Sequence, residues 1–218
     1  MITIINSRFY SALEVVSFFF ILNITWLIVS LPIITIFPAT AAMHGVIRNW
    51  VIHKDTSVIR PFFRFFKENF KHSFIIGLLF AIVSFIFYVD FMFIMTMNSM
   101  MQMVLLSILL LLGIIGTLTS IYLFPVMVHY HLPLKGILKN SFFFSIRYLP
   151  TTILTIIFIG IMLVLLYIMP VLTLVIFSII AYPIFTMCYS KFRKEEELVN
   201  KHSEQDENLV NNHTQQEV

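Results

Sequence analysis

Three polar side chains within long apolar runs are the first candidates for chemistry. Asp90 lies between the apolar residues 85–89 and 91–93. An ionisable group in a transmembrane helix is costly in lipid and often marks a functional position. In a wet cavity, Asp90 could bind a cation or relay a proton; at the outer interface, or as a hydrogen-bond acceptor, it would be structural. Glu14, at the outer edge of the first apolar run, and Asn23, inside it, complete a possible intramembrane polar site.

Prolines interrupt the apolar runs at four positions that we interpret as helix-breaking. They are Pro32, Pro38, Pro125 and Pro183. A proline has no N–H to donate and frees a carbonyl one turn earlier, which must find another partner in the membrane. Broken helices of this kind line solute sites in transporters. The alternative is a simple kink or helix end.

The connector between the first two apolar runs combines cations and phenylalanines at helical spacing. The four cations fall within an arc of about 60°, and four phenylalanines occupy a separate arc of about 100°. These residues are Arg60, Arg64, Lys67 and Lys71, and Phe62, Phe63, Phe66 and Phe70. The pattern predicts a cytoplasmic amphipathic helix lying at the membrane interface. It could anchor the chain on anionic lipid, at about 1 kcal/mol per cation, or dock a cytoplasmic partner.

Motifs for catalysis or metal binding are absent from the sequence. It contains no phosphate-binding glycine loop, no nucleophile elbow and no zinc-protease motif. The spacing of His129 and His131 puts their rings on different faces of a helix, and Cys188 is the single cysteine. We therefore expect no enzymatic activity, no metal and no cofactor.

The fractions of hydrophobic and charged residues indicate whether the chain is surrounded by water or by lipid. The chain is 59% hydrophobic and 11% charged, whereas soluble domains carry about 25% charged residues. Its formal net charge is +3, but the cations lie between apolar runs. This pattern excludes a nucleic-acid-binding protein and favours contact with an anionic lipid bilayer.

Five apolar runs are long enough to cross a ~30 Å hydrocarbon core as helices. They are residues 15–37, 73–97, 103–128, 151–169 and 171–190. Pro170 separates the last two, which predicts a tight hairpin. We expect an all-α polytopic transmembrane bundle over residues 1–190. Residues 191–218 have few apolar side chains, so we expect a disordered cytoplasmic tail.

The lysines and arginines set the predicted orientation. Thirteen of the 14 lie beside the same ends of the apolar runs, in residues 43–72, 129–150 and the tail, and Arg8 is the exception. Basic loops stay in the cytoplasm. The N-terminus is therefore expected outside and the C-terminus inside.

Residues 24–42, 46–50 and 62–71 together resemble the YesL-like family of bacterial multi-pass membrane proteins, a family of unknown function. The similarity extends more loosely through residues 139–141 and 147–152, and Phe37 stands where relatives often have glycine. The resemblance implies a bacterial plasma-membrane protein, often encoded beside carbohydrate uptake and degradation systems. It favours an accessory or regulatory component that contacts a carbohydrate transporter subunit. The alternative is a small solute or ion transporter working as a homo-oligomer.

Overall fold

The computed structural model describes residues 2–97, 100–130 and 132–216, and it places the side chains within those ranges except at 2–12, 202 and 204–216. In this part of the chain all regular structure is helical. The elements are α1 (Ile2–Ser30), η1 (Ile33–Thr35), α2 (Ile36–Ile52), α3 (Ile59–Met95), α4 (Met100–His129), α5 (Leu134–Arg147), α6 (Leu149–Ile168), η2 (Pro170–Leu174) and α7 (Ile176–Gln216). The predicted all-α class is confirmed.

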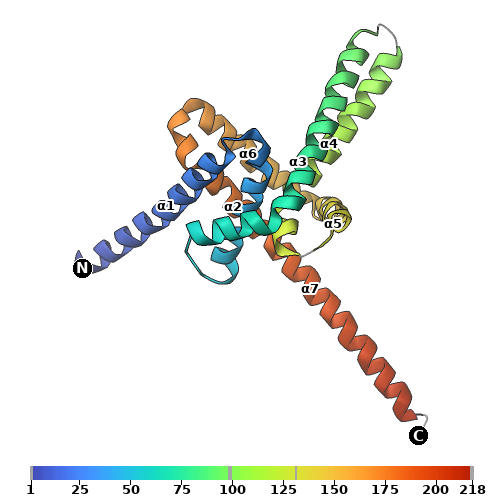
Figure 1. Cartoon of the computed structure of the whole chain (residues 1–218). Coiled ribbons are helices and arrows are strands. Elements are labelled where there is room, and N and C mark those ends of the chain that lie inside the picture. The colour runs from blue at the N-terminus through green and yellow to red at the C-terminus, as the bar shows by residue number, and fades with distance from the viewer. Residues whose placement is uncertain (1, 98–99, 131, 217–218) are drawn as a thin grey trace.

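The central element of the fold is α2. Its residues Ala39, Ala41 and Ala42 are fully buried, as are Val46 and Ile47. Small side chains let helix backbones approach closely, which is how helices associate inside a membrane. The start of α3, the end of α4 and the first part of α7 pack around α2 (Figure 1). We call this packed region the hub.

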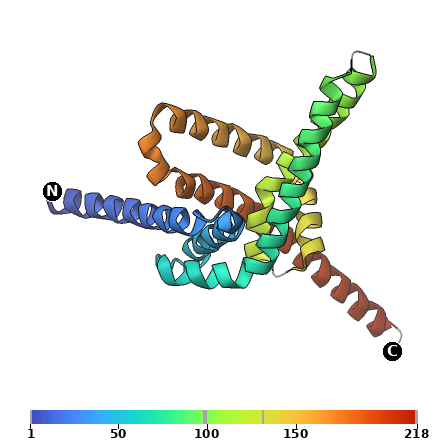
Figure 2. The ribbon, with the colours of Figure 1, turned by 45° about the horizontal axis from the view of Figure 1, so that its top comes forward.

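Four arms leave the hub in both views (Figures 1 and 2). They are the first part of α1, the α3–α4 hairpin, the hairpin of α6 and the start of α7, and the last part of α7. The helices therefore pack around α2 and do not lie side by side along their whole lengths. The predicted break at Pro170 is present, because α6 ends at Ile168 and a 3₁₀ turn leads into α7.

Helix α3 joins two segments that the sequence predicts separately. Figures 1 and 2 show its first part (teal) at a wide angle to the arm that it forms with α4 (green). Asn69 donates to the carbonyl of Phe65 at 3.0 Å, and Ser73 donates to the carbonyl of Asn69 at 2.7 Å. Such side-chain bonds to helix carbonyls compete with the helix ladder and favour bending.

Within the residues that the structure describes, four helical segments are long and apolar enough to cross a membrane. They are Leu13–Ser30, Ile59–Met95, Met100–His129 and Leu149–Ile168. The first predicted run, 15–37, is shorter than expected as a helix, because α1 ends at Ser30 and Pro32 precedes a short 3₁₀ turn. The fifth run, 171–190, forms η2 and the first part of α7. The count of five spans stays a prediction.

The polar tail differs from the disordered segment that its composition predicts. In the structure, α7 continues as one helix to Gln216. Many of its residues, such as glutamate, lysine and glutamine, have high helix propensity. Low hydrophobicity argues against a packed core, but it does not prevent a helix from extending one that already exists.

Candidate functional site

The predicted amphipathic helix forms the first part of α3, residues 59–72, which we call the basic segment. Its four cations are exposed, as the helical wheel predicts. The phenylalanine face is divided: Phe63 and Phe70 are exposed, Phe66 is half-buried and Phe62 is fully buried. The prediction that Phe62 contacts lipid or a partner is wrong, because Phe62 belongs to the core cluster that α3 forms with α2.

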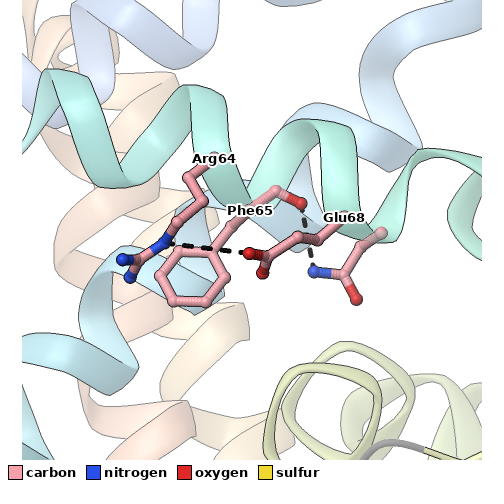
Figure 3. Close-up of polar contacts among 4 residues, drawn as sticks. Arg64, Phe65 and Glu68 are labelled. Carbon is pink, nitrogen blue, oxygen red and sulfur yellow. Dashed lines mark hydrogen bonds and ion pairs between the residues drawn. The ribbon is translucent and has the colours of Figure 1, made fainter.

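A polar pocket of about 490 Å³ lies beside the basic segment. It is lined by Arg48, Asn49, His53, Asp55, Arg64, Phe65 and Glu68. The guanidinium carbon of Arg64 lies 4.8 Å from the centroid of the Phe65 ring, and Arg64 Nε lies 3.9 Å from the Glu68 carboxylate. Figure 3 shows the three side chains together. The side chain of Phe65 is thus held between the α2 core and the Arg64 guanidinium.

The loop between α2 and α3 fixes one wall of this pocket. Asp55 accepts hydrogen bonds from the Ser57 backbone N–H at 3.0 Å and the Ser57 hydroxyl at 2.7 Å. These hydrogen bonds lower the pKa of Asp55. Lys54 has φ of 58°, in the left-handed region that few residues other than glycine adopt. The loop therefore closes as a defined turn with an ionised carboxylate at its centre.

The predicted intramembrane polar site does not assemble in the structure. Asp90 and Glu14 are exposed on different arms. Among the described residues, neither side chain takes part in a hydrogen bond or an ion pair. Asn23 is fully buried, donates to the Thr173 carbonyl at 2.7 Å and accepts from the Ser178 N–H at 3.1 Å. Asn23 therefore ties α1 to the start of α7.

Of the four prolines interpreted as helix-breaking, Pro32 lies at a break and Pro38 lies in the first turn of α2. The interpretation is wrong for Pro125 and Pro183, because α4 and α7 continue through them. Pro32 separates α1 from η1, and the Thr35 hydroxyl donates at 2.6 Å to the carbonyl of Val29, left free by the break. Pro38 and Pro125 are buried inside α2 and α4. The rings of their neighbours Phe37 and Phe124 pack at a tilt of 47°, with centroids 5.9 Å apart. Pro183 lies inside α7 and is half-buried.

His44 is a buried core residue of α2. Burial lowers the pKa of His44 to about 4, although its bond to the Thr40 carbonyl acts in the opposite direction. The ring is therefore neutral near pH 7, and Nδ1 donates to the Thr40 carbonyl at 2.9 Å. It stacks on Phe124, with centroids 5.6 Å apart, and helps to join α2 to α4.

The sequence does not predict a polar cluster that joins α4, the end of α5 and α7. His129 Nε2 lies 3.1 Å from Glu196, and Arg147 Nε lies 2.9 Å from Glu195. Tyr148 donates a hydrogen bond to Glu195. We call these five residues the polar junction. Its carboxylates come from the predicted disordered tail, 47 residues or more from their partners in sequence, and no local spacing signals such a contact.

The aromatic surroundings of the polar junction hold it in place. Burial, with the bond to Glu195, raises the pKa of Tyr148, so its hydroxyl stays protonated and donates. The Lys191 ammonium lies 5.4 Å from the Tyr148 ring centroid. Phe192, fully buried, stacks on His129 with centroids 5.1 Å apart. A pocket of about 340 Å³ lies next to the polar junction, and its lining includes Tyr130, Phe144 and the two glutamates of the junction.

We expect Glu195→Gln to loosen α7 beyond the hub. The change removes the counter-charge of Arg147 and weakens the Tyr148 hydrogen bond. A partly exposed pair of this kind contributes about 1 kcal/mol, so amide hydrogen exchange over residues 190–200 should accelerate about fivefold. Glu197→Gln is the matched control, because Glu197 pairs with Arg193 within α7 at 3.5 Å. Equal acceleration in both variants would show that Glu195 does not hold α7.

Comparisons with known proteins agree with the resemblance seen in the sequence. The family described as "Protein of unknown function, DUF624" matches residues 19–91. Two similar proteins, both from Bacillus subtilis (strain 168), are called uncharacterized proteins YesV and YesL. Uncharacterized protein YesV is 31% identical over 78% of this chain and 84% of its own length. Uncharacterized protein YesL is 30% identical over 57% of this chain, and the match spans 60% of YesL.

No solved structure matches this chain. The family match covers α2 and nearly all of α3, and thus the helix packing that forms the polar pocket and presents the basic segment. The match with YesV extends over most of both chains. With its long apolar helices, this chain belongs to the YesL-like DUF624 family of membrane proteins.

Proposed function

We propose that this protein is a non-enzymatic accessory or regulatory component of carbohydrate uptake in the bacterial plasma membrane. In this proposal it binds a carbohydrate transporter subunit through the basic segment of α3. The observation that carries the proposal is the exposed stripe of four cations, held on a rigid support. The link to carbohydrate uptake comes from the genomic setting that the family resemblance implies.

The stripe has the form of a protein-binding surface. The stripe begins at Arg60 and ends at Lys71, eleven residues further along the chain, which is about 17 Å of helix. They occupy their own arc, so the cations can face water while Phe63 and Phe70 face the membrane. Such a stripe suits an acidic surface on a partner, because complementary charge speeds association and selects against basic proteins.

The fold offers a path from this surface to the membrane. Helix α3 runs without interruption from the basic segment into the α3–α4 arm, and the buried residues Phe62 and Phe65 fix the segment on α2. A partner that moves the segment would therefore act on the arm through the bend near Ser73. This continuity supports a regulatory role.

The test is co-purification from native bacterial membranes in mild detergent. We expect a tagged chain to retain carbohydrate transporter subunits, and replacement of Arg60, Arg64, Lys67 and Lys71 by glutamine to reduce their recovery at least tenfold. A matched pair separates specific contact from loss of net charge. Lys67→Gln with Lys71→Gln should weaken recovery, whereas Lys194→Gln with Lys201→Gln, two exposed cations of α7, should not.

Two outcomes would overturn the proposal. The first is that no transporter subunit is retained by the unmodified chain. The second is that the purified chain alone moves a small solute or ion across vesicles in a manner that requires Asp90. The alternative function, a homo-oligomeric transporter, would then replace it. Asp90 is exposed on α3, where a second copy could cover it.

A further inference from the structure

The exposed face of α5 carries large apolar side chains beside two lysines. A helix that faces only water does not require such apolar side chains. Ile137, Ser141 and Ser145 are buried on the inner side of α5, which packs on α4. The opposite side, which we call the α5 face, falls within an arc of about 100°. It consists of Lys135, Lys139, Phe142, Phe143 and Ile146.

Position along the helix divides the α5 face into a basic half and an apolar half. Both lysines lie in the first half of α5. Phe142, Phe143 and Ile146 lie in the second half and are 37%, 56% and 47% exposed. Only Tyr148 separates α5 from α6, one of the four candidate membrane spans. The apolar half is therefore the part of α5 nearest to the bilayer.

We propose that the α5 face lies on the cytoplasmic leaflet and binds anionic phospholipid headgroups. Phe142, Phe143 and Ile146 insert at the boundary between headgroups and acyl chains, and Lys135 and Lys139 contact the phosphates. The binding of a helix to a membrane surface increases with its buried apolar area and with the attraction of its cations to anionic lipid.

Two features favour a lipid surface over a protein partner at this position. The first is the continuity of the α5 face with a membrane span. The second is that cations and apolar side chains share one arc: the Lys139 ammonium lies 5.9 Å from the Phe143 ring centroid. A lysine beside apolar side chains can extend its stem so that its charge stays at headgroup level while its neighbours enter the apolar layer. In the basic segment of α3, by contrast, cations and phenylalanines occupy separate arcs.

Lipid contact at α5 would also support the polar junction. Arg147 closes α5 and pairs with Glu195 of α7, so a helix held on the leaflet fixes the position from which Arg147 reaches α7. The inference concerns the lipid surface alone and does not require that the protein act in carbohydrate uptake. A negative result in the co-purification experiment would leave it untouched.

The test places a fluorescent probe on the α5 face of the full chain. Cys188 is buried, so Phe142→Cys in a Cys188→Ala background gives one accessible labelling site. The labelled protein is reconstituted in phosphatidylcholine vesicles, with or without phosphatidylglycerol. Quenching is measured with phospholipids that carry a nitroxide at a shallow acyl position. We expect strong quenching that rises with phosphatidylglycerol.

The lysines should account for that rise. Each cation near an anionic surface contributes about fivefold, so Lys135→Gln with Lys139→Gln should reduce the ratio of docked to undocked α5 about 25-fold. Lys194→Gln with Lys201→Gln controls for net charge and should leave quenching unchanged. A probe at Lys201→Cys, on the polar part of α7, should not be quenched. Absence of quenching at position 142 would overturn the proposal. So would quenching that changes neither with phosphatidylglycerol nor with the replacement of the two lysines.

Discussion

We expect Gly45→Ala to separate α2 from the basic segment of α3 and to destabilise the protein by about 2–3 kcal/mol. A Cβ atom at position 45 would lie 2.7 Å from Cδ2 and 2.8 Å from Cβ of Phe65, closer than carbon atoms can approach. Phe65 is buried on α3, and rotation of its ring cannot move its own Cβ. Alanine favours helix over glycine, so the loss would come from the overlap alone.

Thermal unfolding in detergent micelles measures this effect, and we expect the midpoint to fall by about 5–10 °C. Phe65→Leu in the same chain should restore part of the loss, because a smaller side chain leaves room for the new methyl group. Gly160→Ala is the control, since no heavy atom lies within 4 Å of a Cβ at that position. A midpoint for Gly45→Ala equal to that of Gly160→Ala would mean that α2 and α3 are not in close contact at Gly45.

The contact at Gly45 illustrates what the sequence could and could not predict. The apolar runs and the spacing of the four cations are local features, and they predict helices and an exposed basic stripe correctly. Amphipathic spacing does not reveal which neighbour covers the apolar side. The buried residues of α3 include Phe62, Phe65, Ser73 and Ile76, at intervals of three, eight and three that keep them on one side of the helix. That pattern was present but hidden among six phenylalanines in residues 59–74.

Two further differences arise from contacts between distant segments. A single apolar run, 15–37, becomes the end of α1, a break and the start of α2. Pro32 signals the break, but the burial of α2 depends on α3, α4 and α7 closing around it. The polar junction is less predictable still. From the sequence, Glu195 and Glu196 are expected to be solvated residues of a polar tail. In the structure, α7 places them beside Arg147 and His129.

Asn23 shows how a residue chosen for chemistry can instead hold the fold together. Its carboxamide meets both polar groups that the α6–α7 hairpin turns toward α1, the Thr173 carbonyl and the Ser178 N–H. The first N–H groups of a helix have no partner within it, so Asn23 caps α7 from another helix. The Ser178 hydroxyl adds a bond at 2.9 Å to the Phe19 carbonyl. These three bonds join segments about 150 residues apart.

We therefore expect Asn23→Leu to cost about 3–5 kcal/mol, because a buried carbonyl and a buried N–H lose their partners at about 1–3 kcal/mol each and the larger side chain strains the contact. The midpoint of thermal unfolding in micelles should fall by about 10 °C or more. Thr25→Val on the same helix is the matched control, because the Thr25 hydroxyl donates to Ile21 within α1 and is exposed. If both variants unfold at the same temperature, the Asn23 bridge contributes nothing to stability, and α1 must be held to α7 by aromatic contacts such as Trp26 on Phe177.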